Sequence, residues 1–181
     1  MKRFFLITLA FLLALSLQAK NPITTFLGIP VDGTKSEMIS KLKEKGVLTE
    51  AGSEMRCSIS GVPYIVKIMT DKNKVYRISL TEVAGTDDVC KAVAKYNELI
   101  EQFRNNDKEY TEYESNDLIH ECDSPKYRHY IHEGWCYAEF FQVSDPQLYS
   151  KRVSFKISDE YGDFRIVRCY DNIYNMPKGL N

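Results

Sequence analysis

The chain has 181 residues, of which 27% are charged and 12% aromatic, and its formal net charge is −1. A chain of this length has room for one domain or for two small ones. Its near balance of charge provides neither a basic field for a nucleic-acid backbone nor a polybasic segment for anionic lipids, so we expect no nucleic-acid partner.

The first 19 residues predict a secretory signal peptide. Lys2 and Arg3 form a short basic start, an almost uninterrupted apolar run covers 4–15, and 16–19 is small and polar enough for signal peptidase. Cleavage after Ala19 and cleavage after Ser16 both stay open. The apolar run is too short for a comfortable membrane span and no second run follows. We therefore expect an exported protein, periplasmic or secreted, with no membrane span after signal cleavage.

The first unit, 20–84, is predicted to be a helix followed by a small antiparallel sheet. Thr34 can cap a helix, and Glu37 three residues later completes a capping box. The helix is expected from Lys35 to Lys45, just before Gly46. Strands with one apolar side each are expected at 55–59, 64–69 and 75–80.

The second unit, 85–181, is predicted to repeat this order. A helix is expected to open at Thr86 and to end near 104–106. Its apolar residues recur at helical spacing: Val89, Val93, Tyr96, Ile100 and Phe103. Strands are expected at 127–132, 135–143, 153–158 and 164–169.

The two units also share a hairpin-like sequence. VKIMTDKNKVYRISL at 66–80 is echoed by FKISDEYGDFRIVR at 155–168, with Arg77-Ile78 matching Arg165-Ile166. A tandem duplication would explain the echo, although two amphipathic hairpins can also resemble each other by chance. We therefore expect an α+β fold made of two tandem units, each a helix followed by a small antiparallel β-sheet.

This arrangement, over 26–170, resembles the fold of secreted β-lactamase inhibitor proteins. The segment with Thr34, Glu37, Met38 and Leu42 is similar to the opening helix of the small outer-membrane-assembly lipoproteins, and FLGIPVDG at 26–33 resembles the start of a group of uncharacterised exported bacterial proteins. The inhibitor resemblance implies that a concave sheet lined with aromatic side chains is the binding surface.

Five cysteines would enter an oxidising compartment, where a disulfide is expected. A bridge between Cys122 and Cys136 would close a short ring. The alternative is that all five are small buried core residues.

One cluster is suggestive of metal or nucleophilic chemistry. It comprises His120, Cys122, His129, His132, Glu133 and Cys136. However, His129 and His132 would point to opposite faces of the expected strand, and no CxxC or HExxH spacing is present. We therefore assign no metal ligand, no cofactor and no catalytic residue, and the absence of nucleophile-elbow, P-loop and dinucleotide motifs makes an enzyme the weaker class.

The stretch 107–123 holds acidic side chains with only one base, Lys108. We expect a solvated loop, including an edge strand that its charges keep from pairing further. A docking edge for a basic partner and a weak calcium site are the alternatives.

An aromatic run at 127–141 is the candidate binding face. Trp135, Tyr137 and Phe141 would share one side of a strand, with Tyr130 nearby. If the opposite side packs on the helices, these rings lie on the open face of the sheet; the competing assignment places Trp135 and Phe141 in the core. We expect a non-enzymatic module, inhibitor-like in type, that binds another envelope or secreted protein. A structural accessory in envelope assembly, and a hydrolase or metal protein built on the His120–Cys136 cluster, are the alternatives.

Overall fold

The computed structural model describes residues 23–106, 109–115, 124–142, 150–160 and 162–180; the predicted signal peptide lies outside them. The helices are α2 (Lys35–Glu44), α3 (Val89–Arg104) and α4 (Ser124–His132), with a 3-10 turn η1 (Ile173–Asn175) near the end. The strands are β1 (Thr25–Phe26), β2 (Ile29–Pro30), β3 (Thr49–Ala51), β4 (Glu54–Ile59), β5 (Val62–Asp71), β6 (Lys74–Glu82), β7 (Thr111–Ser115), β8 (Tyr137–Phe141), β9 (Lys151–Ser158) and β10 (Arg165–Asn172). No helix in the described ranges is long and apolar enough to cross a membrane.

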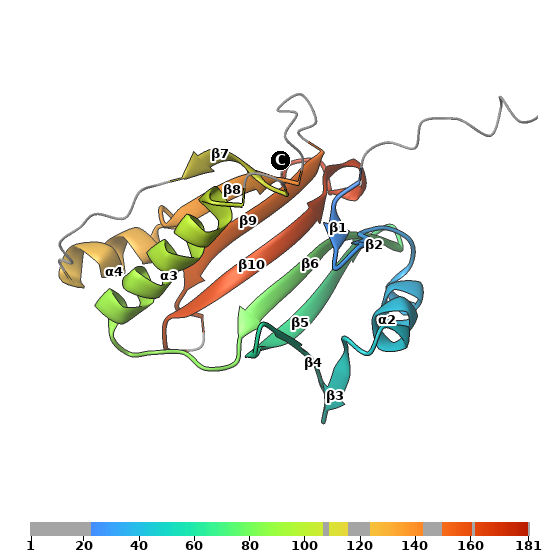
Figure 1. The fold of residues 1–181 in the computed structure, drawn as a ribbon, viewed down its shortest axis with the longest axis horizontal. Helices are drawn as coiled ribbons and strands as arrows, with labels where there is room; N and C mark the ends of the chain where they lie inside the picture. Colours follow the sequence, from blue (N-terminus) through green and yellow to red (C-terminus); the bar gives the residue numbers. More distant parts are fainter. Residues whose placement is uncertain (1–22, 107–108, 116–123, 143–149, 161, 181) are drawn as a thin grey trace, which may run out of the picture.

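One large sheet dominates the protein. Eight antiparallel strands follow the order β3-β4-β5-β6-β10-β9-β8-β7, and β1 and β2 form a separate two-stranded ribbon (Figure 1). The prediction of two tandem units, each with its own small sheet, is therefore wrong. The reason is that β6 of the first half pairs with β10 of the second, so that neither strand is left as an open edge with unpaired backbone groups.

The pairing of β6 with β10 is nearly symmetric. The sequence echo of 66–80 and 155–168 matches Leu80 with Arg168, and these two residues are also register partners across the two strands. The register pairs on either side of Leu80 and Arg168 are arranged symmetrically about this central pair. An approximate two-fold axis thus passes between Leu80 and Arg168, at the centre of the sheet.

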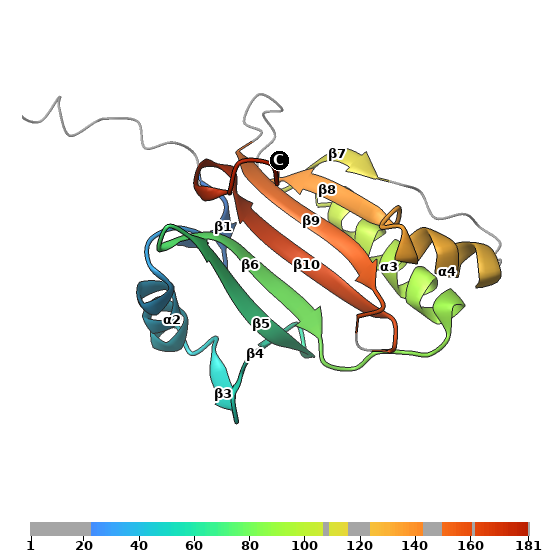
Figure 2. The ribbon, with the colours of Figure 1, turned by 180° about the vertical axis from the view of Figure 1, so that it is seen from behind.

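One side of the sheet, here called the covered face, packs under the helices. Met38 and Leu42 of α2 and Val93 and Tyr96 of α3 are buried in a single core with strand residues of this face. Those strand residues are Cys57, Tyr64, Val66, Ile68, Ile78, Leu80, Ala138, Phe140, Val153, Phe155, Ile157, Ile166 and Tyr170. Seen from behind, β5, β6, β10 and β9 have no helix in front of them, and this side is the open face (Figure 2).

Local sequence signals account for the first two helices. The backbone N–H of Glu37 donates to the Thr34 hydroxyl at 3.3 Å, and the N–H of Thr34 donates to the Glu37 carboxylate at 2.8 Å, which confirms the predicted capping box. Helix α3 begins later than predicted because Asp88, not Thr86, caps it: the Asp88 carboxylate accepts from the N–H of Cys90 at 2.9 Å.

The third helix, α4, replaces a predicted strand. The segment 127–132 was expected to be extended, but it is helical. Tyr127 and Ile131 lie four residues apart, so a helix places both on one face, where both are buried. Gly134 adopts a positive φ of 74° directly after the helix, as glycine does at a helix C-terminus.

Part of the acidic stretch, strand β7, lies at the margin of the sheet. Strand β7 is the outermost strand and pairs only with β8 among the described strands, in agreement with the expected charged edge strand. The rest of the acidic stretch, 107–108 and 116–123, lies outside the described residues.

Candidate binding surface

An exposed cluster of rings marks the end of α4. We call His129, Tyr130 and Trp135 the aromatic corner: the Trp135 ring centroid lies 5.2 Å from that of Tyr130 and 5.5 Å from that of His129. Trp135 is 51% exposed, and Tyr130 is half-buried. The corner therefore presents the rings of Trp135 and His129 to solvent, beside the half-buried ring of Tyr130.

The helix end holds Trp135 in place. The N–H of Gly134 donates to the carbonyl of Ile131 at 3.0 Å, and the N–H of Trp135 donates to the carbonyl of Tyr130 at 2.8 Å. These two bonds, together with the positive φ of Gly134, form a Schellman motif. Since the backbone of Trp135 is bonded to the helix, the indole does not depend on a loose loop for its position.

Two cationic side chains lie on α4, and one of them contacts the aromatic corner. The Lys126 ammonium lies 5.4 Å from the Tyr130 ring centroid. The Arg128 guanidinium lies 4.9 Å from the ring centroid of Phe164 and donates to the Asp87 carbonyl at 3.1 Å. Both cationic side chains are exposed on α4. Lys126 is therefore the cation at the aromatic corner, whereas Arg128 is engaged with Phe164 and Asp87.

The other two predicted binding residues lie elsewhere. Strand β8 begins only at Tyr137, so Trp135 belongs to the turn after α4 and not to the same strand face as Tyr137 and Phe141. Tyr137 is half-buried, and Phe141 is buried. The structure thus brings Tyr130 and Trp135 together at the surface and leaves Phe141 away from solvent.

An ionic cluster lies on the open face, near the C-terminal end of β10. Asp171 is fully buried and accepts from Arg77 at 2.6 and 2.8 Å and from Arg152 at 3.1 and 3.3 Å. The hydrogen bonds with Asp171 raise the pKa of Arg77. Arg152 also lies 3.7 Å from Glu139, whose pKa is raised by burial. Charged side chains therefore occupy this part of the sheet surface, whereas the resemblance to inhibitor proteins implied aromatic rings.

The cysteines are not paired as expected. Cys136 is a free, buried thiol, as are Cys57 and Cys169, so the predicted Cys122–Cys136 bridge is absent, while Cys90 is disulfide-bonded. Cys122 itself lies outside the described residues. Burial raises the pKa of both Cys57 and Cys136 to about 11.

The histidines lie on a helix and not on a strand. His129 and His132 are three residues apart in α4, about one turn, and His132 Nδ1 lies 3.7 Å from the Asp159 carboxylate. Within the described ranges, no three side chains of His, Cys, Asp or Glu are grouped so that they could hold a metal ion. His120 lies outside those ranges.

Comparison with known proteins adds no relative: no family model, no curated protein and no solved structure matches the chain. The resemblance to the β-lactamase inhibitor proteins and to the outer-membrane-assembly lipoproteins stays a prediction. The function is therefore argued from the surface itself.

Proposed function

We propose that this protein is an exported, non-enzymatic module that binds another envelope or secreted protein through the aromatic corner. The observation that carries the proposal is the half-exposed Trp135, which a Schellman turn holds against Tyr130. Tryptophan and tyrosine dominate the energetics of protein interfaces because each buries a large apolar area while few torsions become ordered.

The fixed position of Trp135 favours recognition. A side chain that is already held in its bound position loses little entropy when a partner covers it. A Schellman motif often includes a hydrophobic contact of this kind, but a smaller apolar residue would provide that contact without placing an indole in water. The size and exposure of Trp135 are therefore better explained by a partner than by the helix end alone.

The neighbouring cation Lys126 defines the partner further. The Lys126 ammonium lies over the Tyr130 ring, so we expect an apolar pocket with a carboxylate at its border on the bound protein. Rim charges act mainly on the rate of association and on its salt dependence. The association rate should accordingly fall as ionic strength rises.

The test combines capture with a measured affinity. Tagged mature protein is used to capture partners from the exported fractions of its own host, and the Kd of each purified partner is then measured with wild type and with Trp135→Ala. We expect Trp135→Ala to weaken binding by about 2 kcal/mol or more, which is a ~30-fold or greater rise in Kd.

Tyr174→Ala provides the matched control. Tyr174 is also aromatic and 51% exposed, but it lies in η1, which follows β10 and is remote from α4 in the chain. Its substitution should leave Kd unchanged. Equal effects of the two substitutions on Kd, or a partner whose Kd neither substitution changes, would contradict the proposed surface.

A further inference from the structure

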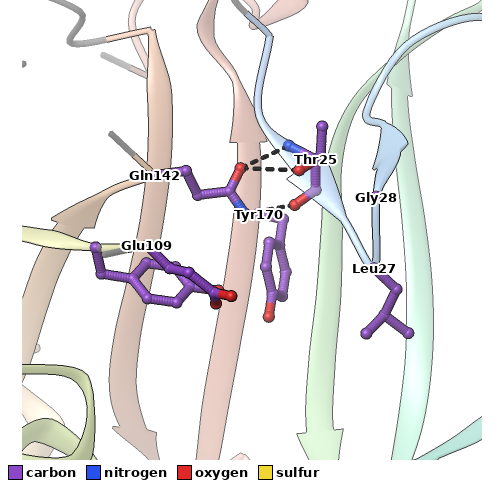
Figure 3. A pocket seen from close by; sticks show the side chains of 7 residues that line it. Thr25, Leu27, Gly28, Glu109, Gln142 and Tyr170 are labelled. Atoms are coloured by element: carbon purple, nitrogen blue, oxygen red, sulfur yellow. Dashed lines mark hydrogen bonds between the residues drawn. The ribbon is translucent and has the colours of Figure 1, made fainter. Parts of the chain in front are cut away.

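A pocket opens on the covered face of the sheet. It has a volume of about 450 Å³ and lies between the β1–β2 ribbon and the residues Glu109 and Tyr110, with β10 beneath (Figure 3). The side chains that line it are Thr25, Leu27, Glu109, Tyr110, Gln142 and Tyr170. Gln142 accepts from the N–H of Thr25 at 2.7 Å and donates to the Thr25 carbonyl at 2.6 Å, so one wall is held in place by hydrogen bonds.

A buried cation lies next to this pocket. Arg168 of β10 is 8% exposed, and its guanidinium lies 5.2 to 5.8 Å from the ring centroids of Phe103, Phe155 and Tyr64. No carboxylate in the described part of the chain forms an ion pair with it, and its buried Nε has no hydrogen-bond partner there. Burial opposes the charge, but neighbouring tyrosine oxygens hold the Arg168 pKa above its ordinary value.

Packing does not explain this arginine. A buried charge without a counter-ion costs free energy that stacking on aromatic rings offsets only in part. The pseudo-symmetric residue of the first half is Leu80, which is fully buried in the same core. An aliphatic side chain is therefore compatible with the centre of the covered face. Packing alone does not explain why the matching position holds the charged Arg168.

Tyr170 connects the cation to the pocket. Arg168 Nη1 donates to the Tyr170 hydroxyl at 3.4 Å, and Tyr170 lines the pocket. Because the hydroxyl accepts from Arg168, its own proton is available to a group in the pocket. Tyr110 also lines the pocket, and burial raises its pKa to about 12, so it too is a protonated donor at neutral pH.

We propose that this pocket binds a small organic monocarboxylate. The carboxylate accepts hydrogen bonds from the phenolic hydroxyls of Tyr110 and Tyr170, while Arg168 behind them supplies the compensating positive charge. Leu27 contributes an apolar surface for the organic part. The exposed carboxylate of Glu109 also lines the pocket, which disfavours a second negative charge on the ligand. This site is separate from the aromatic corner and does not depend on it.

Benzoate and benzamide make the first comparison, since they differ in charge and hardly in shape. Their Kd values are measured with the full mature protein by chemical-shift perturbation of its amide resonances. We expect benzoate to bind at least tenfold more tightly than benzamide, with shifts at Tyr110, Gln142 and Tyr170. Equal affinity for the two, or shifts confined to other surfaces, would overturn the proposal.

Variants separate a ligand role from a structural one. Arg168→Leu should weaken benzoate binding at least tenfold without lowering the thermal midpoint, because it removes an unpaired buried charge and copies Leu80. Tyr170→Phe should weaken binding with no loss of fold, and Glu109→Gln should tighten it. If Arg168→Leu fails to fold, Tyr170→Phe and Glu109→Gln still decide the matter: benzoate affinity that is unchanged in both contradicts the site.

Discussion

At the scale of single residues, two buried charges on opposite sides of β10 differ in how they are compensated. Asp171 on the open face is held by two arginines, so its charge is part of the folded structure. Arg168 on the covered face has aromatic neighbours and one tyrosine hydroxyl. Because buried charges are normally paired, an exception next to a pocket is more informative about ligands than about stability.

The free thiols give a prediction at the same scale. Cys57 and Cys136 are buried, and their pKa values are about 11, so they stay protonated well above neutral pH. Only the thiolate reacts with alkylating agents. We expect iodoacetamide at pH 8 to leave both unmodified in the folded protein and to modify both in urea, as read by peptide mass spectrometry. Rapid labelling of either residue without denaturant would contradict their burial.

At the scale of elements, helix ends depend on a few local bonds. Thr34→Ala removes the hydroxyl that accepts from Glu37, and it should lower the free energy of unfolding by about 1 kcal/mol. The measurement is urea unfolding of wild type and variant. Ser40→Ala is the matched control, because the Ser40 hydroxyl donates to an exposed Glu44 within α2; its effect should stay within about 0.5 kcal/mol. A Thr34→Ala effect no larger than that of Ser40→Ala would show that the capping box adds no stability.

Element type was predictable wherever local signals were strong. The capping box at Thr34, the apolar spacing in α3 and the alternation in β5 and β9 all act between residues close in sequence. The sequence of α4 predicts a strand because tyrosine and isoleucine favour strands; the four-residue spacing of Tyr127 and Ile131 is the opposing, helical signal. Gly134 was the signal that could have revealed this helix end, and with it the place of Trp135.

At the scale of the whole molecule, β6 and β10 join the two halves into one sheet over one core. We therefore expect one cooperative unfolding transition. Fluorescence of Trp135, the single tryptophan, reports on the second half, whereas far-UV circular dichroism reports on all strands. The two signals should give coincident curves in urea. Two separated transitions would indicate that the halves unfold independently.

The sequence by itself determined the local structure: two capped or periodic helices, the alternating strands and the echo between two hairpins. These features arise from hydrogen bonds and side-chain spacing over a few residues, so they can be read without knowing the fold. Only the tertiary structure decided that the hairpins meet edge to edge, that Phe141 is buried while Trp135 is exposed, and that Arg168 lies among rings beside a pocket. Strand pairing and burial depend on residues as far apart as Leu80 and Arg168, and no pattern within a short segment specifies which distant strand completes the sheet.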